Sequence, residues 1–76
     1  MNILVCDDDR EIVDAIDIYL SNEGYHILKA YDGIQALKAV EENEIHLIIM
    51  DIMMPNLDGN RATKKIREEY SIPIIM

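Results

Sequence analysis

The chain has 76 residues, of which 50% are hydrophobic, so it is long enough for one small globular domain. Fifteen acidic residues against seven basic ones give a formal net charge of -8, which disfavours direct binding to a nucleic-acid backbone. The single cysteine, Cys6, excludes an intramolecular disulfide and is typical of a reducing compartment. No apolar stretch approaches the roughly 20 residues of a membrane-spanning helix. We therefore expect a cytoplasmic protein without a membrane partner.

Apolar periodicity in the first half of the chain predicts two strands, each followed by a helix. Residues 3–6 form an apolar run that predicts a buried strand, and Asp9 is placed to cap a helix that ends at Gly24. Residues 25–30 predict a second strand, and a second helix runs from 34 to about 43. The apolar positions of the two helices recur at three- and four-residue steps: Ile12, Val13, Ile16, Tyr19 and Leu20, then Ile34, Leu37 and Val40.

The second half of the chain repeats this alternation. Residues 46–51 predict a third strand, and residues 52–59 predict a loop that contains proline and glycine. A third helix is expected over 60–69, and the apolar segment 72–76 predicts a fourth strand. The third helix carries its apolar residues on one side and its basic residues on the other: Ala62, Ile66 and Tyr70, then Arg61, Lys64, Lys65 and Arg67.

Alternating strands and helices with short connections predict an α/β fold with a parallel sheet. Right-handed crossovers, with the first helix on one face and the other two on the opposite face, give a doubly wound, flavodoxin-like sheet with strand order 2-1-3-4. Ligands of such sheets bind at the carboxyl ends of the strands, where the order reverses between strands 1 and 3. The last strand has an unpaired outer edge and no helix after it, so we expect a domain cut short that can self-associate.

An acidic cluster is predicted at that edge of the sheet. Asp7, Asp8 and Asp9 follow the first strand, and Asp51 ends the third. Crowded carboxylates repel one another unless a cation joins them, and Mg2+ takes one or two carboxylates beside phosphate oxygens. We interpret Asp51 as a nucleophile that becomes an aspartyl phosphate, with Asp7 and Asp8 holding the metal. Position alone leaves the reverse assignment open.

Three stretches of the chain resemble the receiver domain of two-component response regulators: ILVCDDDREI, LIIMDIMMPNLDG and IPIIM. The resemblance implies that Asp51 accepts a phosphoryl group from the phosphohistidine of a sensor histidine kinase. It also implies a magnesium site in which Asp8 binds the metal directly, Asp7 binds largely through water and Met53 contributes its backbone carbonyl. Asp51 is then modified once and the chain is no enzyme in the ordinary sense.

The resemblance also describes what should surround this segment. Receivers carry a hydroxyl residue at the tip of the fourth strand and a lysine at the tip of the fifth, and this sequence stops about two residues before that hydroxyl. Residues 1–76 are thus expected to be the amino-terminal part of a receiver that lacks its last two helices and its fifth strand. The likeness is to receivers that precede a winged-helix domain, so DNA would be reached only through that domain, to regulate transcription. The kinase would dock mainly on the first helix.

Two other functions remain open from the residues themselves. Asp7 and Asp9 form an acid-x-acid pattern typical of haloacid-dehalogenase-like Mg2+ phosphatases, although Glu11 stands where that family has Thr or Val. The chain could instead be an inactive fragment that forms a homodimer or a larger assembly through its open sheet edge. His26 and His46 lack the spacing of a zinc site.

Overall fold

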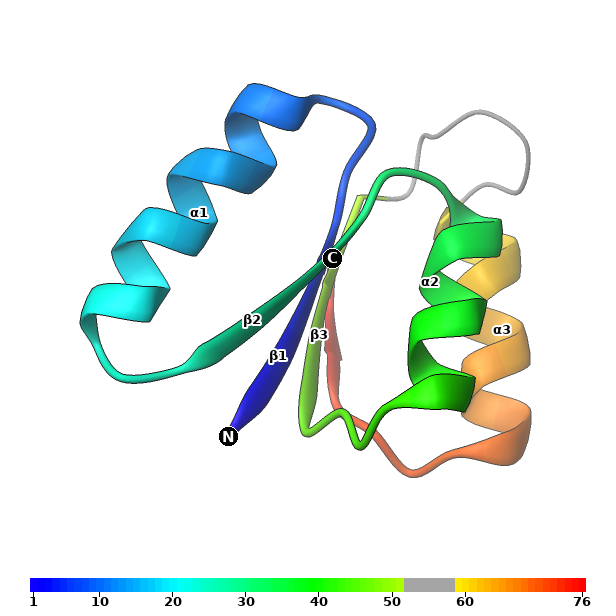
Figure 1. The fold of residues 1–76 in the computed structure, drawn as a ribbon. Coiled ribbons are helices and arrows are strands. Elements are labelled where there is room, and N and C mark those ends of the chain that lie inside the picture. The colour runs from blue at the N-terminus through cyan, green and yellow to red at the C-terminus, as the bar shows by residue number, and fades with distance from the viewer. Residues whose placement is uncertain (52–58) are drawn as a thin grey trace.

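The computed structural model describes residues 1–51 and 59–76, and the predicted loop at 52–59 lies almost wholly outside them (Figure 1). Strands and helices alternate along the chain as the sequence pattern predicts. The elements are β1 (Asn2–Cys6), α1 (Arg10–Asn22), β2 (His26–Ala30), α2 (Gly33–Glu42), β3 (Leu47–Met50), α3 (Gly59–Glu69) and β4 (Ile74–Ile75).

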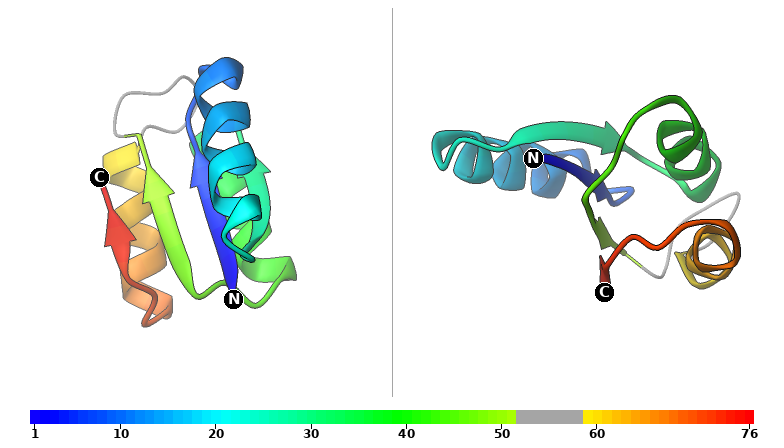
Figure 2. Two further views of the ribbon diagram at one scale, coloured as in Figure 1. Left: turned by 90° about the vertical axis from the view of Figure 1, so that its left-hand side faces the viewer. Right: turned by 90° about the horizontal axis from the view of Figure 1, so that it is seen from below.

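The four strands form one parallel sheet in the order β2-β1-β3-β4, which confirms the predicted topology. β1 lies at the centre, where Cys6 pairs with Ala30 of β2 on one side and with Met50 of β3 on the other. Figure 1 shows α1 on one face of the sheet and α2 and α3 on the opposite face. The views of Figure 2 show the same three layers, with the strand arrows pointing to a common edge. That common edge is the carboxyl edge of the sheet.

Both faces of the central strands are buried. Leu4, Cys6 and Ile48 belong to the larger core beneath α2 and α3, whereas Ile3 and Val5 pack with Val13 of α1. This alternation follows from the two-residue period of a strand, and it explains why the first strand reads as an unbroken apolar run. The larger core consists of Leu4, Cys6, Ala30, Ala36, Val40, Ile45, Ile48, Met50, Ala62 and Ile66.

The helix boundaries have local causes. The side chain of Asp9 accepts hydrogen bonds from the backbone N–H groups of Glu11 and Ile12, so Asp9 is the N-cap of α1 as predicted. Asp32 caps α2 in the same way through the N–H of Gln35. After α1 the chain turns at Gly24, whose φ of 93° lies in the left-handed region that glycine adopts without a steric penalty.

The apolar stripes of the helices were predicted too wide. Tyr19 of α1 is 69% exposed and Ile34 of α2 is 59% exposed, whereas Val13 and Val40 are buried. A short helix on a four-stranded sheet buries only one narrow face, so the apolar residues beside that face stay in solvent. None of the helices in the described part of the chain is both long and apolar enough to cross a membrane.

The buried centre of β3 should control the stability of the fold. Ile48 is 0% exposed and contacts both neighbouring strands through its pairs with Leu4 and Ile74. We expect Ile48→Ala to lower the free energy of unfolding by about 2 to 5 kcal/mol, from the lost transfer energy and the cavity left behind. Urea unfolding followed by circular dichroism measures this change. Ile34→Ala is the matched control, because the same atoms are removed from an exposed site and should change stability by less than about 0.5 kcal/mol.

Candidate metal site at the carboxyl edge of the sheet

The backbone pairing of β1 with its two neighbours places two aspartates side by side. The N–H of Asp7 donates to the carbonyl of Ala30 at 3.1 Å, and the N–H of Asp51 donates to the carbonyl of Cys6 at 2.8 Å. Both hydrogen bonds continue the parallel ladders beyond the last strand residues. Because Cys6 pairs with Met50, Asp7 and Asp51 occupy the next position on neighbouring strands, at the predicted point where the strand order reverses.

Three carboxylates converge there. Asp7, Asp8 and Asp51 each present one oxygen, and these oxygens all lie within 4.8 Å of one another. Two ligands on opposite sides of an octahedral magnesium ion are about 4 Å apart, since each bond is about 2.1 Å long. The cluster therefore fits a small divalent cation that binds some carboxylates directly and others through water. The structure brings together Asp7 and Asp8, the predicted metal ligands, and Asp51, the predicted nucleophile.

The cluster carries an electrostatic cost. Partial burial raises the pKa of Asp7 above its ordinary value, and the charges of Asp51 and Asp8 act in the same direction. The hydrogen bond from the N–H of Asp9 to Oδ1 of Asp7, at 2.9 Å, opposes that rise. A bound divalent cation would instead lower the pKa of Asp7, because it favours the ionised form of a carboxylate.

Cys6 lies directly beneath the cluster and is not a ligand candidate. Its side chain is buried, and burial together with the charges of Asp32, Asp7 and Asp51 raises the pKa of the thiol to about 12. The thiol therefore stays protonated at neutral pH and donates a hydrogen bond to the carbonyl of Asp32 at 3.4 Å. A cavity of about 390 Å³ opens beside Asp7 and Asp51, with Cys6 and Met76 also in its wall.

The remaining predicted site residues do not enlarge the cluster. Asp9 uses its Oδ1 as the N-cap of α1, 3.0 Å from the N–H of Glu11, so its predicted structural role is confirmed. Met53 lies outside the described residues, and its predicted carbonyl ligand stays a prediction. His46 accepts a hydrogen bond from the N–H of Asn2 at 2.9 Å and contacts Glu44, so it belongs to the opposite edge of the sheet.

Sequence reasoning missed one contact beside the cluster. The guanidinium carbon of Arg10 lies 3.9 Å from the ring centroid of Tyr31, a cation–π geometry. Arg10 begins α1 and Tyr31 directly follows β2. The two residues are 21 positions apart in the chain. Their sequence positions contain no periodicity that indicates this contact. Only the predicted topology, which brings the carboxyl ends of neighbouring strands together, could have suggested it.

The fold is a flavodoxin-like α/β domain with a cluster of three aspartates at the carboxyl edge of its sheet. The family model of the response regulator receiver domain matches residues 3–76. The chain belongs to that family, as the three sequence stretches had suggested.

Curated relatives and solved structures agree with this assignment. The regulatory protein VanR of Enterococcus faecium is 43% identical over 74 residues, which cover 97% of this chain and 32% of VanR. The response regulator GtcR of Aneurinibacillus migulanus is 42% identical over 97% of this chain and 31% of its own length. The chain thus spans about a third of the curated relatives it matches.

Solved structures extend the likeness to three dimensions. The response regulator TrrA of Thermotoga maritima, in complex with Mg2+ and BeF, has a TM-score of 0.93 at 36% identity and is covered to 66% of its length. TrrA was also solved in complex with the histidine kinase ThkA, and that structure matches with a TM-score of 0.90 at 35% identity over 96% of this chain and 64% of that one.

The raised pKa of Asp7 predicts the sign of a pH effect in the absence of divalent ions. The folded chain holds a proton on Asp7 more tightly than the unfolded chain does, so the stability contributed by this group is lost as the pH rises above its ordinary pKa of 3.8. We therefore expect Asp7→Asn to raise the urea midpoint at pH 7 and to have a smaller effect as the pH falls toward 4. Glu41→Gln makes the same charge change at an exposed position of α2 and should leave the urea midpoint nearly unchanged. A lower midpoint for Asp7→Asn at pH 7 would contradict the assignment.

Proposed function

We propose that this chain is a phosphoacceptor module of a two-component signalling system, with Asp51 as the residue that is phosphorylated. The observation that carries the proposal is the convergence of Asp7, Asp8 and Asp51, whose carboxylate oxygens lie within 4.8 Å of one another. Asp7 and Asp8 would hold Mg2+ together with Asp51 and the backbone carbonyl of Met53. The complex of the similar protein TrrA with Mg2+ and BeF supports the choice of metal.

The proposed reaction transfers one phosphoryl group. A carboxylate oxygen of Asp51 attacks phosphorus, the bond between phosphorus and the imidazole nitrogen of phosphohistidine breaks, and the imidazole leaves and takes up a proton. Mg2+ in the site would neutralise negative charge on the phosphoryl oxygens. Asp7 and Asp8 would serve as its ligands, and the pairing of β1 with β3 holds Asp7 next to Asp51. Since the phosphoryl group stays on Asp51, each chain accepts one group and is not a catalyst with multiple turnovers.

A sensor histidine kinase is the proposed partner, and the complex of TrrA with the kinase ThkA supports this choice. We place its docking surface on α1, where Ile12 and Tyr19 are exposed and Val13 faces the sheet. Any regulation of transcription would pass through an effector domain that binds DNA, in a longer cytoplasmic parent protein. That residues 1–76 are the amino-terminal part of a receiver domain stays a prediction, and the intact mass of the natural protein tests it.

Chemical phosphorylation tests the acceptor. Incubation of the chain with Mg2+ and acetyl phosphate should add one phosphoryl group, because the small donor supplies the group without a kinase. Asp51→Asn should abolish the addition, since an amide oxygen is a far weaker nucleophile than a carboxylate oxygen. Intact-mass spectrometry detects the product.

The control for this experiment is Asp14→Asn, which removes the same charge from the exposed side of α1. Equal labelling of the Asp51→Asn and wild-type chains would refute the proposal. Sustained hydrolysis of a phosphomonoester, lost in Asp7→Asn, would instead support a phosphatase. The phosphatase has less support, because Asp9, its general acid, is engaged as a helix cap.

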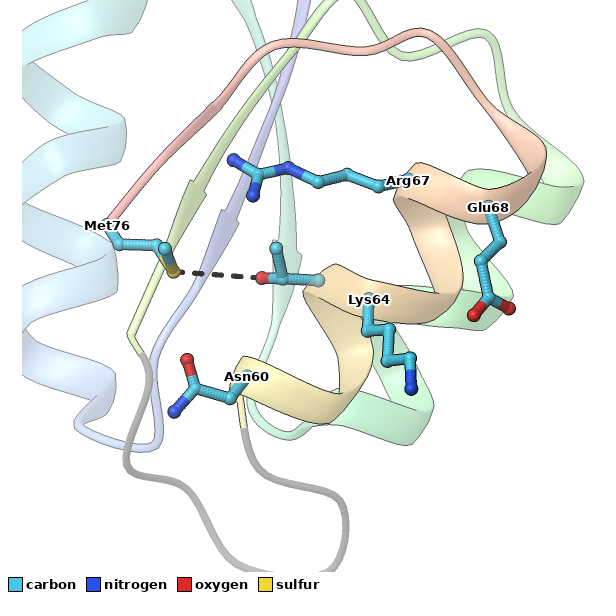
Figure 3. Close-up of a pocket in the computed structure, with 6 residues that line it drawn as sticks. Asn60, Lys64, Arg67, Glu68 and Met76 are labelled. Carbon is cyan, nitrogen blue, oxygen red and sulfur yellow. Dashed lines mark hydrogen bonds between the residues drawn. The ribbon is translucent and has the colours of Figure 1, made fainter.

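A second candidate function is association of two copies through β4. Among the described strands β4 pairs only with β3, and Ile75 and Met76 are 57% and 60% exposed. Figure 3 shows the Met76 side chain directed toward α3, where its sulfur lies 3.8 Å from the hydroxyl of Thr63, beside a pocket of about 430 Å³. An apolar edge strand of this kind is a template for pairing with another chain.

This association predicts a concentration-dependent mass. The wild-type chain should sediment partly as a dimer at tens of micromolar, roughly where weak protein pairs form. Ile75→Lys should shift it to the monomer, because a lysine at an edge strand must lose its hydration to enter an interface. Ile18→Lys, which replaces an isoleucine of α1 that is 66% exposed against 57% for Ile75, is the control and should leave the mass unchanged.

A further inference from the structure

Arg10 lies at the carboxyl edge of the sheet and is held there by an aromatic ring. Cys6 pairs with both Ala30 and Met50, so the next residues, Tyr31, Asp7 and Asp51, follow one another across three neighbouring strands. Neighbouring strands are about 4.8 Å apart. The ring that carries the Arg10 guanidinium therefore stands in the same row as the two central carboxylates of the site.

The ring of Tyr31 is fixed from two sides. The backbone N–H of Tyr31 donates to Oε1 of Gln35 at 2.9 Å, which ties the Tyr31 backbone to the first turn of α2. Its side chain packs against the core of Ile3, Val5 and Val13, which is the face covered by α1. A cation over such a ring gains about 0.5 to 1 kcal/mol at an exposed site, so the ring restricts where the guanidinium lies.

The charge of Arg10 is still available to a ligand. Within the described residues Arg10 forms no ion pair. Lys29 of β2, in contrast, is paired with two aspartates of α1, Asp14 at 2.9 Å and Asp17 at 3.1 Å. Arg10 is exposed and follows the acidic run directly. A ring presents no acceptor oxygens, so the five N–H donors of the guanidinium are not consumed by the cation–π contact.

We propose that Arg10, positioned by Tyr31, attracts and orients the anionic phosphoryl donor at the acidic cluster. The inference rests on the proposed phosphoacceptor function. A fixed positive charge at the rim raises the rate at which an anion arrives, and salt weakens this effect. The same charge repels a divalent cation. Removal of Arg10 should therefore slow phosphorylation and tighten magnesium binding, two opposite effects that damage to the fold would not produce together.

The experiment compares Arg10→Gln with the wild-type chain at saturating Mg2+ and low ionic strength, with acetyl phosphate as donor. We expect the initial rate of phosphorylation to fall about threefold and Mg2+ affinity, measured by calorimetry, to rise about twofold. In about 1 M sodium chloride, where the Debye length is about 3 Å, the rate difference should disappear.

Two matched variants separate position from charge. Lys38→Gln removes the same charge from the exposed side of α2 and should leave both quantities near their wild-type values. Tyr31→Phe keeps the ring and should behave as wild type, whereas Tyr31→Leu keeps an apolar side chain without a π face and should reproduce part of the Arg10→Gln loss.

An unchanged rate in Arg10→Gln, a loss that persists in high salt, or an equal loss in Lys38→Gln would each overturn the inference while the proposed function stands. A wild-type chain that binds no Mg2+ and takes up no phosphoryl group would overturn the proposed function, and this inference with it.

Discussion

The parallel pairing of β1 with β3 is the constraint on which the rest of the structure depends. Both strands are apolar on both faces, and a shift of one residue would move Leu4 and Ile48 out of the core beneath α2 and α3. The register is therefore fixed by burial. Because each strand ends in an aspartate, the same register that completes the core brings Asp7 and Asp51 to neighbouring positions.

Hydrophobic burial and carboxylate repulsion oppose each other in this arrangement. Burial of β1 and β3 holds together acidic side chains that would separate in an unfolded chain. The pKa of Asp7 is raised first by burial and then by the charges of Asp51 and Asp8. The repulsion is confined to the strand tips, while the apolar contacts extend along the whole length of the strands. The fold can therefore maintain this cluster of carboxylates, and a cation bound there would reduce the repulsion and stabilise the folded state.

Much of this could be predicted from the sequence, because strand periodicity and helix caps are local signals. Apolar runs and the handedness of crossovers predict the order of the strands, and with it the proximity of Asp7 to Asp51. The position of Asp9 before an apolar helical pattern predicts the N-cap of α1. The exposure of Ile34 and the stacking of Arg10 on Tyr31 do not follow. They depend on how wide a strip of each helix the sheet covers, and on which rotamers bring two distant side chains together, and neither is encoded in a periodic pattern.

The charges at the sheet edge explain why a single arginine has a place in this site. If the three carboxylates of the cluster all carry a negative charge, their sum of -3 repels a phosphoryl donor, which is itself an anion. A divalent ion bound there would reduce this charge to -1, and the charge of the Arg10 guanidinium would bring the sum of ion and side chains to zero. If Arg10 were instead drawn into the cluster it would compete with the cation, because a guanidinium binds carboxylates in a bidentate manner. The contact with the Tyr31 ring holds the Arg10 guanidinium at the rim of the site, outside the cluster of carboxylates. Under the proposed function, the acids would bind a metal cation, and the arginine that the ring positions would attract the anionic phosphoryl donor.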